Sequence, residues 1–112
     1  MAKQDESGTG GATGTGTQVL ENVQSKTAKP KMYKVVFHND DYTTMEFVVS
    51  ILMSIFHHTE ASAVKIMMHI HTNGVGVAGV YTKEVAETKV AQTTHHARKN
   101  DYPLEVTIEP VD

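Results

Sequence analysis

Apolar residues are almost missing from the first 31 positions of this chain, whereas they recur regularly from position 32 onward. The first 31 positions also hold five of the eight glycines. A segment of this composition cannot bury enough apolar surface to offset the conformational entropy lost on ordering. We therefore expect residues 1–31 to be a flexible, disordered N-terminal extension. Residues 32–112 are expected to form one small domain with a single core.

The spacing of apolar residues after position 31 first indicates a strand and then a helix. Tyr33, Val35 and Phe37 fall on one side of a strand that begins at residue 32. A T-x-x-E sequence follows, in which Thr43 is the expected N-cap and Glu46 reaches back to it. The apolar spacing behind this capping box predicts a helix over 45–57.

The second half of the domain repeats this alternation. Spacings of three and four predict a helix from about 59 to 72, which Asn73-Gly74 ends. A short strand is expected over 75–81, and Thr82 is expected to cap a third helix over about 83–99. Alternating apolar residues after Pro103 predict a last strand. The fold class is thus α+β: a small three-stranded antiparallel sheet with three helices packed on it, in the order β-α-α-β-α-β.

Composition excludes several classes of partner and chemistry. The formal net charge is −3 and lysine and arginine do not cluster, so neither nucleic acid nor an anionic membrane is an expected partner. Cysteine is absent, which removes disulfides, thiol catalysis and thiolate metal sites. No apolar run is long enough to cross a bilayer, and none follows Lys3 as a signal peptide requires. We expect a cytoplasmic monomer without a cofactor.

Residues 74–79 match the G-x-G-x-x-G pattern letter for letter. The nucleotide-binding use of that pattern requires a strand before it and a helix directly after it. Here a helix precedes the glycines and a strand overlaps them. We interpret Gly74, Gly76 and Gly79 as a turn with close backbone packing instead.

The histidines and carboxylates raise the hypothesis of a metal site or an enzyme. The chain has seven histidines, including two adjacent pairs, but adjacent histidines on a helix point in different directions. No H-E-x-x-H pattern and no nucleophile elbow is present. We therefore expect neither a metal nor a catalytic residue. A histidine-based metallohydrolase remains the alternative from another functional class.

The chemistry of Asn39, Asp40 and Asp41 together with His71 is more suggestive. These residues place oxygen and nitrogen acceptors at the end of a strand and at the end of a helix. Packing of the two elements would bring this polar rim beside an apolar pocket, formed by Met45, Val48, Met67 and Ile70. Such a site suits a cation attached to a large hydrophobic group. The alternative interpretation is core methionines beside a solvated turn.

Three longer segments are distinctive: YKVV at 33–36 with NDDYTTMEFV at 39–48, GVYTKEVAETKV at 79–90, and the stretch from Ala97-Arg98 to Pro103-Leu104. Together they closely resemble the ClpS adaptor family. The similarity spans about residues 32–109 in the expected order. One departure is Thr44, where the family pattern usually has proline.

The resemblance implies a non-enzymatic adaptor of the N-end rule. Such proteins bind substrates that begin with Leu, Phe, Tyr or Trp, called N-degrons, and deliver them to the ClpA-type AAA+ unfoldase of the ClpAP protease. It implies that Asn39, Asp41 and His71 contact the substrate α-amino group, with Asp40 adding negative charge. The implied side-chain pocket consists of Thr43, Met45, Val48, Met67, Ile70 and Leu104.

The resemblance also implies more specific roles. Met45 resembles a gatekeeper that disfavours β-branched first residues. Glu84 and Lys89 fall where the family meets the N-terminal domain of the unfoldase, and residues 1–31 fall where the unfoldase engages the adaptor during delivery. An accessory Clp adaptor with a different peptide ligand is the alternative within this class.

Overall fold

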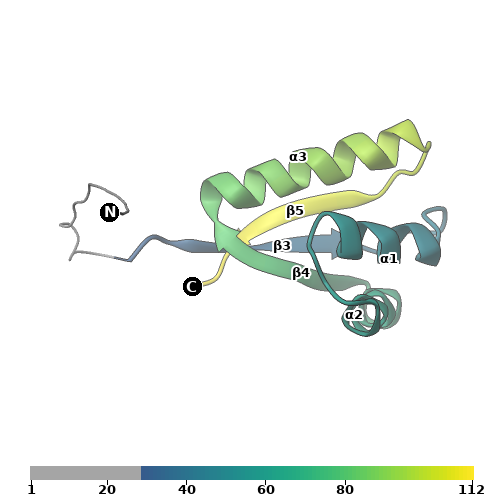
Figure 1. Ribbon diagram of the computed structural model, residues 1–112, viewed down its shortest axis with the longest axis horizontal. Coiled ribbons are helices and arrows are strands. Elements are labelled where there is room, and N and C mark those ends of the chain that lie inside the picture. Colours follow the sequence, from purple (N-terminus) through teal and green to yellow (C-terminus); the bar gives the residue numbers. More distant parts are fainter. Residues whose placement is uncertain (1–28) are drawn as a thin grey trace, which may run out of the picture. The chain divides into compact units, whose positions relative to one another are not determined.

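The computed structural model describes residues 29–112 (Figure 1). The extension predicted over residues 1–31, with its role in delivery, falls almost entirely on residues 1–28 and so lies outside the described residues. Residues 31–112 form one compact unit. Its elements are β3 (Met32–His38), α1 (Met45–Ser54), α2 (Glu60–Asn73), β4 (Val75–Thr82), α3 (Lys83–Lys99) and β5 (Glu105–Pro110).

The three strands form one antiparallel sheet in the order β4-β3-β5, so β3 is the central strand. With the three helices, this arrangement confirms the predicted α+β fold and the predicted element order for the described part of the chain. The register between β3 and β4 shifts between Val35 and Val36, which marks a β-bulge. Because β3 is central, its C-terminal end delivers the following loop to the middle of one end of the sheet.

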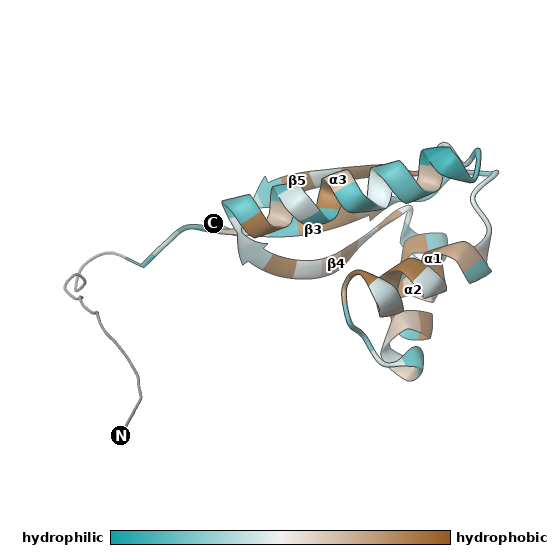
Figure 2. Ribbon diagram, turned by 45° about the horizontal axis from the view of Figure 1, so that its top comes forward, coloured by the Kyte–Doolittle hydropathy of each residue, from teal (hydrophilic) through white to brown (hydrophobic). Residues whose placement is uncertain are grey.

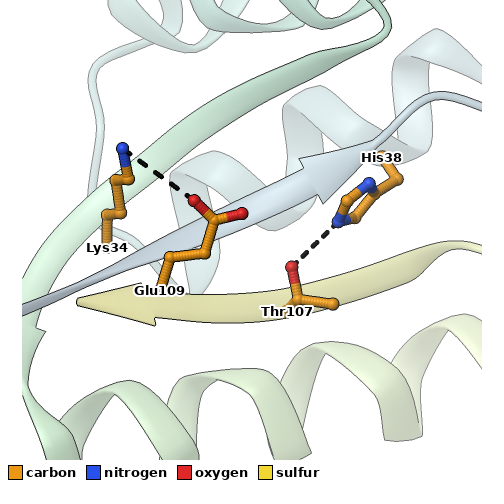
Figure 3. A network of polar contacts seen from close by, with 4 residues as sticks. All are labelled: Lys34, His38, Thr107 and Glu109. Carbon is orange, nitrogen blue, oxygen red and sulfur yellow. Dashed lines mark hydrogen bonds and ion pairs between the residues drawn. The ribbon is translucent and has the colours of Figure 1, made fainter. Parts of the chain in front are cut away.

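The two faces of the sheet have different chemistry. Phe37 of β3 is fully buried on the face that packs against the helices. Side chains alternate along a strand, so Lys34 and His38 lie on the other face. There Lys34 Nζ is 3.9 Å from a Glu109 carboxylate oxygen, and His38 Nε2 is 2.8 Å from the Thr107 hydroxyl (Figure 3). These cross-strand contacts link β3 to β5 on the face away from the core.

The helices supply the rest of the core. In Figure 1, α3 lies along the sheet, and it contacts all three strands, while α2 packs on β4 and α1 packs on α2. Figure 2 shows more apolar sequence on α1 and α2 than on α3, most of which is hydrophilic. The buried cluster consists of Val35, Phe37, Val48, Ile51, Leu52, Ile55, Phe56, Ala63, Met67, Ile70, Ala78, Ala86, Ala97, Leu104 and Val106.

The start of α1 differs from the prediction by one residue. Thr44, not Thr43, is the N-cap, and its hydroxyl accepts a hydrogen bond from Phe47 N–H at 3.1 Å. The reason is that Asp40 already engages both the N–H and the hydroxyl of Thr43. Among residues 29–112, Glu46 makes no hydrogen bond back to Thr43, so the predicted capping box does not form.

The end of α1 also differs, because the helix stops at Ser54 and not at residue 57. His57 adopts the left-handed conformation (φ 61), and His58 N–H donates to Leu52 O at 3.0 Å. A bulky residue seldom takes a positive φ, so the sequence carried no signal for this stop. Thr59 then caps α2, with its hydroxyl accepting from Ser62 N–H at 3.2 Å.

Of the three glycines expected to form a turn, only Gly74 does so, because Gly76 and Gly79 lie within β4. Gly74 ends α2 in the left-handed conformation (φ 88). A Cβ on Gly76 would lie 2.6 Å from Ile70 Cγ1, so glycine is needed there for α2 to approach β4. Thr82 occupies the N-cap of α3 as predicted, although its side chain makes no capping hydrogen bond. No helix among residues 29–112 is long and apolar enough to cross a membrane.

Candidate functional site

A cavity of about 360 Å³ lies where the loop after β3 meets α1 and α2. Its volume is near the lower end of the range for small-molecule sites, which suits one large side chain rather than an extended ligand. The lining residues are Asn39, Asp40, Asp41, Tyr42, Thr43, Thr44, Met45, Val48, Met67, Ile70 and His71. The fold therefore brings together nine of the residues singled out in the sequence, namely Asn39, Asp40, Asp41, Thr43, Met45, Val48, Met67, Ile70 and His71.

Asp40 organises the loop on the polar side of this cavity. Its Oδ1 accepts hydrogen bonds from Tyr42 N–H at 2.8 Å and Thr43 N–H at 2.7 Å, and its Oδ2 accepts from the Thr43 hydroxyl at 2.7 Å. Burial by itself raises the pKa of this carboxyl, but the hydrogen bonds from Thr43 and Tyr42 and the charge of Arg98 outweigh it, so the pKa lies below its usual value. Asp40 is thus an ionised carboxylate whose oxygens are engaged within the loop.

Asn39, Asp41 and His71 are differently placed. All three side chains are exposed and line the cavity, and none makes a hydrogen bond to another residue of 29–112. Asn39 is held through its backbone, because its N–H donates to Gly74 O at 2.8 Å just beyond the end of α2. His71 lies in the last turn of α2. These three side chains therefore present hydrogen-bonding groups to the cavity without partners from the described chain.

The other side of the cavity is apolar and belongs to the core. Val48, Met67 and Ile70 are 7%, 9% and 3% exposed, and all three are members of the buried cluster. Met45, at the first position of α1, is 43% exposed and stands at the edge of the cavity. A wall made from core side chains on two packed helices is stiff, whereas a half-exposed methionine at the rim is free to change rotamer.

Leu104 differs from the expectation for the pocket. It is 2% exposed and belongs to the core cluster, but it is not among the residues that line the cavity. Its neighbour Tyr102 instead approaches the entrance, where Thr44 Oγ lies 3.4 Å from the Tyr102 hydroxyl. Arg98 holds this connection by donating to Tyr102 O at 2.8 Å and Leu104 O at 3.1 Å.

Two lining residues, Tyr42 and Thr44, were not singled out from the sequence as cavity residues. Tyr42 is 76% exposed, a high value for a large aromatic side chain. The sequence does not show whether a single tyrosine in a polar turn is exposed. The one sequence signal that Tyr42 and Thr44 line the cavity is that both lie between Asp41 and Met45.

Glu84 and Lys89 lie on α3 and do not line the cavity. Lys89 is half-buried: its Nζ donates to Ile55 O at 2.6 Å and lies 5.6 Å from the centre of the Tyr81 ring and 6.0 Å from that of Phe56. It therefore ties α3 to the end of α1. Glu84 is exposed in the first turn of α3, and both residues line the same shallow hollow.

The described residues are not arranged to hold a metal ion. Among the described residues, no group of three or more His, Asp or Glu side chains is placed to hold a metal ion. What the site offers is a set of oxygen acceptors and a histidine beside an apolar hollow. That combination suits recognition of a cationic group attached to a hydrophobic side chain.

A family model and several relatives that match this chain carry the same description. Residues 28–107 match the family model described as ATP-dependent Clp protease adaptor protein ClpS. The ATP-dependent Clp protease adapter protein ClpS of Caulobacter vibrioides (strain NA1000 / CB15N) is 50% identical over 109 residues, which cover 97% of this chain and 98% of that protein. The ClpS adapter of Lawsonia intracellularis (strain PHE/MN1-00) is 57% identical over 90 residues, covering 80% of this chain and 83% of that protein.

A solved structure shares the fold. Agrobacterium tumefaciens ClpS2 bound to L-phenylalaninamide aligns with a TM-score of 0.71 at 39% identity, covering 73% of this chain and 99% of that one. The relatives are named as adapters of a protease and not as enzymes, which confirms the prediction of a non-enzymatic adaptor. The chain belongs to the ClpS family of ATP-dependent Clp protease adaptor proteins.

Proposed function

We propose that the cavity binds the N-terminal residue of proteins destined for the Clp protease. The observation that carries this proposal is the two-sided lining, with acceptors from Asn39, Asp41 and His71 facing an apolar wall. The Agrobacterium relative, described as bound to L-phenylalaninamide, supports it. That ligand has a free α-amino group on the carbon that carries a benzyl side chain, which is the chemistry of an N-terminal phenylalanine.

In this proposal the polar rim reads the α-amino group. A free α-amino group has a pKa of about 7.7–8.0 and is mostly cationic at neutral pH. Asn39 and Asp41 accept its hydrogen bonds, His71 accepts through a ring nitrogen, and the ionised Asp40 adds negative charge close by. Each charge-assisted hydrogen bond contributes roughly 1.5–3 kcal/mol.

The apolar side reads the first side chain, with Thr43, Met45, Val48, Met67 and Ile70 around it. Burial of a Leu or Phe side chain contributes about 1.5–3 kcal/mol. Together with the amine contacts, and after the cost of association, this gives dissociation constants on the order of micromolar. Leu, Phe, Tyr and Trp fit such a pocket. We propose that Met45 at the rim disfavours Ile and Val by crowding a branched Cβ.

We further propose that the adaptor passes these substrates to a ClpA-type unfoldase through the surface that contains Glu84 and Lys89. The two residues support this by lining one exposed hollow on α3 that is distinct from the cavity. Engagement of residues 1–31 by the unfoldase, the monomeric state and the cytoplasmic location stay predictions. Removal of residues 1–28 is expected to abolish delivery of a substrate while leaving peptide affinity unchanged.

Fluorescence anisotropy with labelled peptides tests the central proposal. A peptide that begins with Phe is expected to bind, whereas its Nα-acetylated form and a peptide that begins with Ile are expected to bind at least tenfold more weakly. His71→Ala is expected to weaken binding of the Phe peptide, and His69→Ala on the same helix serves as its control. Equal binding of the three peptides would refute the proposal.

A further inference from the structure

Beside the candidate cavity lies a second hollow, which the amine-binding site does not use. It runs between α1 and α2, with a volume of about 350 Å³. We call it the α1–α2 groove and define it by its lining residues Met45, Glu46, Val49, Ser50, Met53, Glu60, Val64 and Met67. Met45 and Met67 line both the groove and the cavity, so the two hollows share a wall.

The groove is more apolar than an ordinary helix surface. Met53 and Val64 are each 39% exposed, and Met45 is 43% exposed, so three large apolar side chains gather at one exposed place. The apolar colouring of α1 and α2 in Figure 2 is consistent with this. A contiguous cluster of exposed apolar side chains often marks a binding surface, whereas single exposed apolar residues are normal. Methionine is flexible and polarizable, which suits a surface that accepts many different sequences.

Glu46 and Glu60 are exposed lining residues, and no cationic residue of 29–112 lines the groove. An acidic side chain is therefore disfavoured there, whereas an apolar one that leaves the glutamates in water is not. Because Met45 and Met67 line both hollows, the groove adjoins the cavity that we propose for the first residue of the substrate. The occupant that fits both facts is the substrate itself, downstream of its first residue.

We propose that the α1–α2 groove is a subsite for the third residue of the substrate and that it selects an apolar side chain. Successive side chains of an extended peptide point to opposite sides, with a rise of about 3.3 Å per residue. When the first side chain enters the cavity, the second points away from the adaptor. The third points back to the adaptor surface about 7 Å further along the chain, two residues after the first. This inference rests on the proposed function of the cavity.

The test compares three free-amine peptides that begin with Phe and differ only at positions two and three: Ala-Ala, Leu-Ala and Ala-Leu. Anisotropy titrations with the full chain are expected to show the Ala-Leu peptide binding about three- to tenfold tighter than Ala-Ala. Leu-Ala is expected to match Ala-Ala. Val64→Ser and Met53→Ser are expected to abolish the gain from Leu at position three and to leave the affinity for Ala-Ala unchanged.

Val85→Ser is the matched control, since Val85 is an exposed valine on α3 and lines neither the cavity nor the α1–α2 groove. It is expected to keep the preference for Leu at position three. Failure of all three peptides to bind would refute the proposed function of the cavity, not this inference alone. Binding of all three with equal affinity would overturn the groove subsite while the function of the cavity stands.

Two further outcomes would also overturn the subsite. The first is a gain from Leu at position two, or a gain at position three that survives in Val64→Ser and Met53→Ser. The second is a change of sedimentation coefficient in these variants without a change of peptide affinity. In that case the groove contacts a second copy of the chain instead of the substrate.

Discussion

The carboxylates of the two adjacent aspartates in the loop after β3 make different contacts. Asp40 accepts three hydrogen bonds from Tyr42 and Thr43, whereas Asp41 has no hydrogen-bond partner among residues 29–112. We therefore expect Asp40→Ala to lower both stability and peptide binding, and Asp41→Ala to lower binding alone. The two substitutions remove the same charge from adjacent positions, so each serves as the control for the other.

The size of the stability difference follows from these contacts. Hydrogen bonds to a charged group contribute about 1.5–3 kcal/mol each, but Asp40 is only half-buried and the three bonds share one acceptor group. We take about 2 kcal/mol for the set. For a domain of this size, each kcal/mol shifts Tm by about 4–8 °C, so Asp40→Ala is expected to lower Tm by roughly 8–16 °C. Asp41→Ala is expected to change the free energy of unfolding by less than about 0.5 kcal/mol.

The pH dependence gives an independent check on the same reasoning. The pKa of Asp40 in the folded protein lies below its ordinary value of 3.8, because the hydrogen bonds outweigh the effect of burial. A depressed carboxyl pKa contributes stability that is fully present above the unfolded value and is lost as pH falls through the folded value. The Tm difference between the parent and Asp40→Ala is therefore expected to be constant from pH 7 down to about 5 and to shrink below about pH 4.

Differential scanning calorimetry and peptide anisotropy on the parent and the two variants decide the matter. Binding of a Phe peptide is expected to fall by about 10- to 100-fold in Asp41→Ala, the equivalent of one charge-assisted hydrogen bond. If Asp40→Ala has the same Tm as Asp41→Ala, or if its Tm difference from the parent persists unchanged below pH 3, Asp40 does not organise the loop.

Four other substitutions, at three positions, test the framework around the site. Lys89→Met removes the hydrogen bond to Ile55 O and two cation–π contacts. Thermal unfolding is therefore expected to show a free energy of unfolding lower by about 2 kcal/mol, with peptide affinity within twofold of the parent. An unchanged Tm would show that Lys89 is a free surface cation. Thr44→Ala loses the cap of α1 and is expected to cost about 1 kcal/mol in urea denaturation. Thr44→Pro also loses the cap but fits φ −73, so it is expected to cost less than Thr44→Ala; the reverse order would contradict this account. Gly76→Ala places a Cβ 2.6 Å from Ile70 Cγ1 and is expected to lower the free energy of unfolding by about 1–3 kcal/mol. It is also expected to weaken peptide binding, because Ile70 lines the cavity. Calorimetry and anisotropy on one sample check both effects.

Periodic patterns predicted most of the fold. The spacing of three and four in α2 reports which side chains face the core. In β3 the alternation is imperfect, because Val36 is buried together with Val35 and Phe37. The end of α2 was predictable because Gly74 takes a conformation that most residues avoid. The end of α1 was not, because a positive φ is uncommon at any residue other than glycine, so His57 alone did not predict it.

The candidate site was predictable to the extent that its members lie on such patterns. Met67, Ile70 and His71 follow one another on the face of α2 that turns to the cavity, and the loop residues follow β3 directly. What the sequence could not show is a competition for hydrogen bonds within the loop. Thr43 and Thr44 are chemically alike, and only the position of Asp40 decides which of them caps the helix.

The different contacts of Asp40 and of its neighbours Asn39 and Asp41 affect which ligands the loop can bind. An amine-binding rim must keep its acceptors unpaired until the ligand arrives, and unpaired acceptors are mobile unless something else fixes the backbone. Here Asp40 and the hydrogen bond from Asn39 N–H to Gly74 O fix the loop, so that the side chains of Asn39 and Asp41 need no internal partners. Preorganisation of this kind lowers the entropy cost of binding. Under the proposed function, an acetylated terminus would meet acceptors that cannot rearrange to find other partners. The rigidity that favours the free amine would then also disfavour the blocked one.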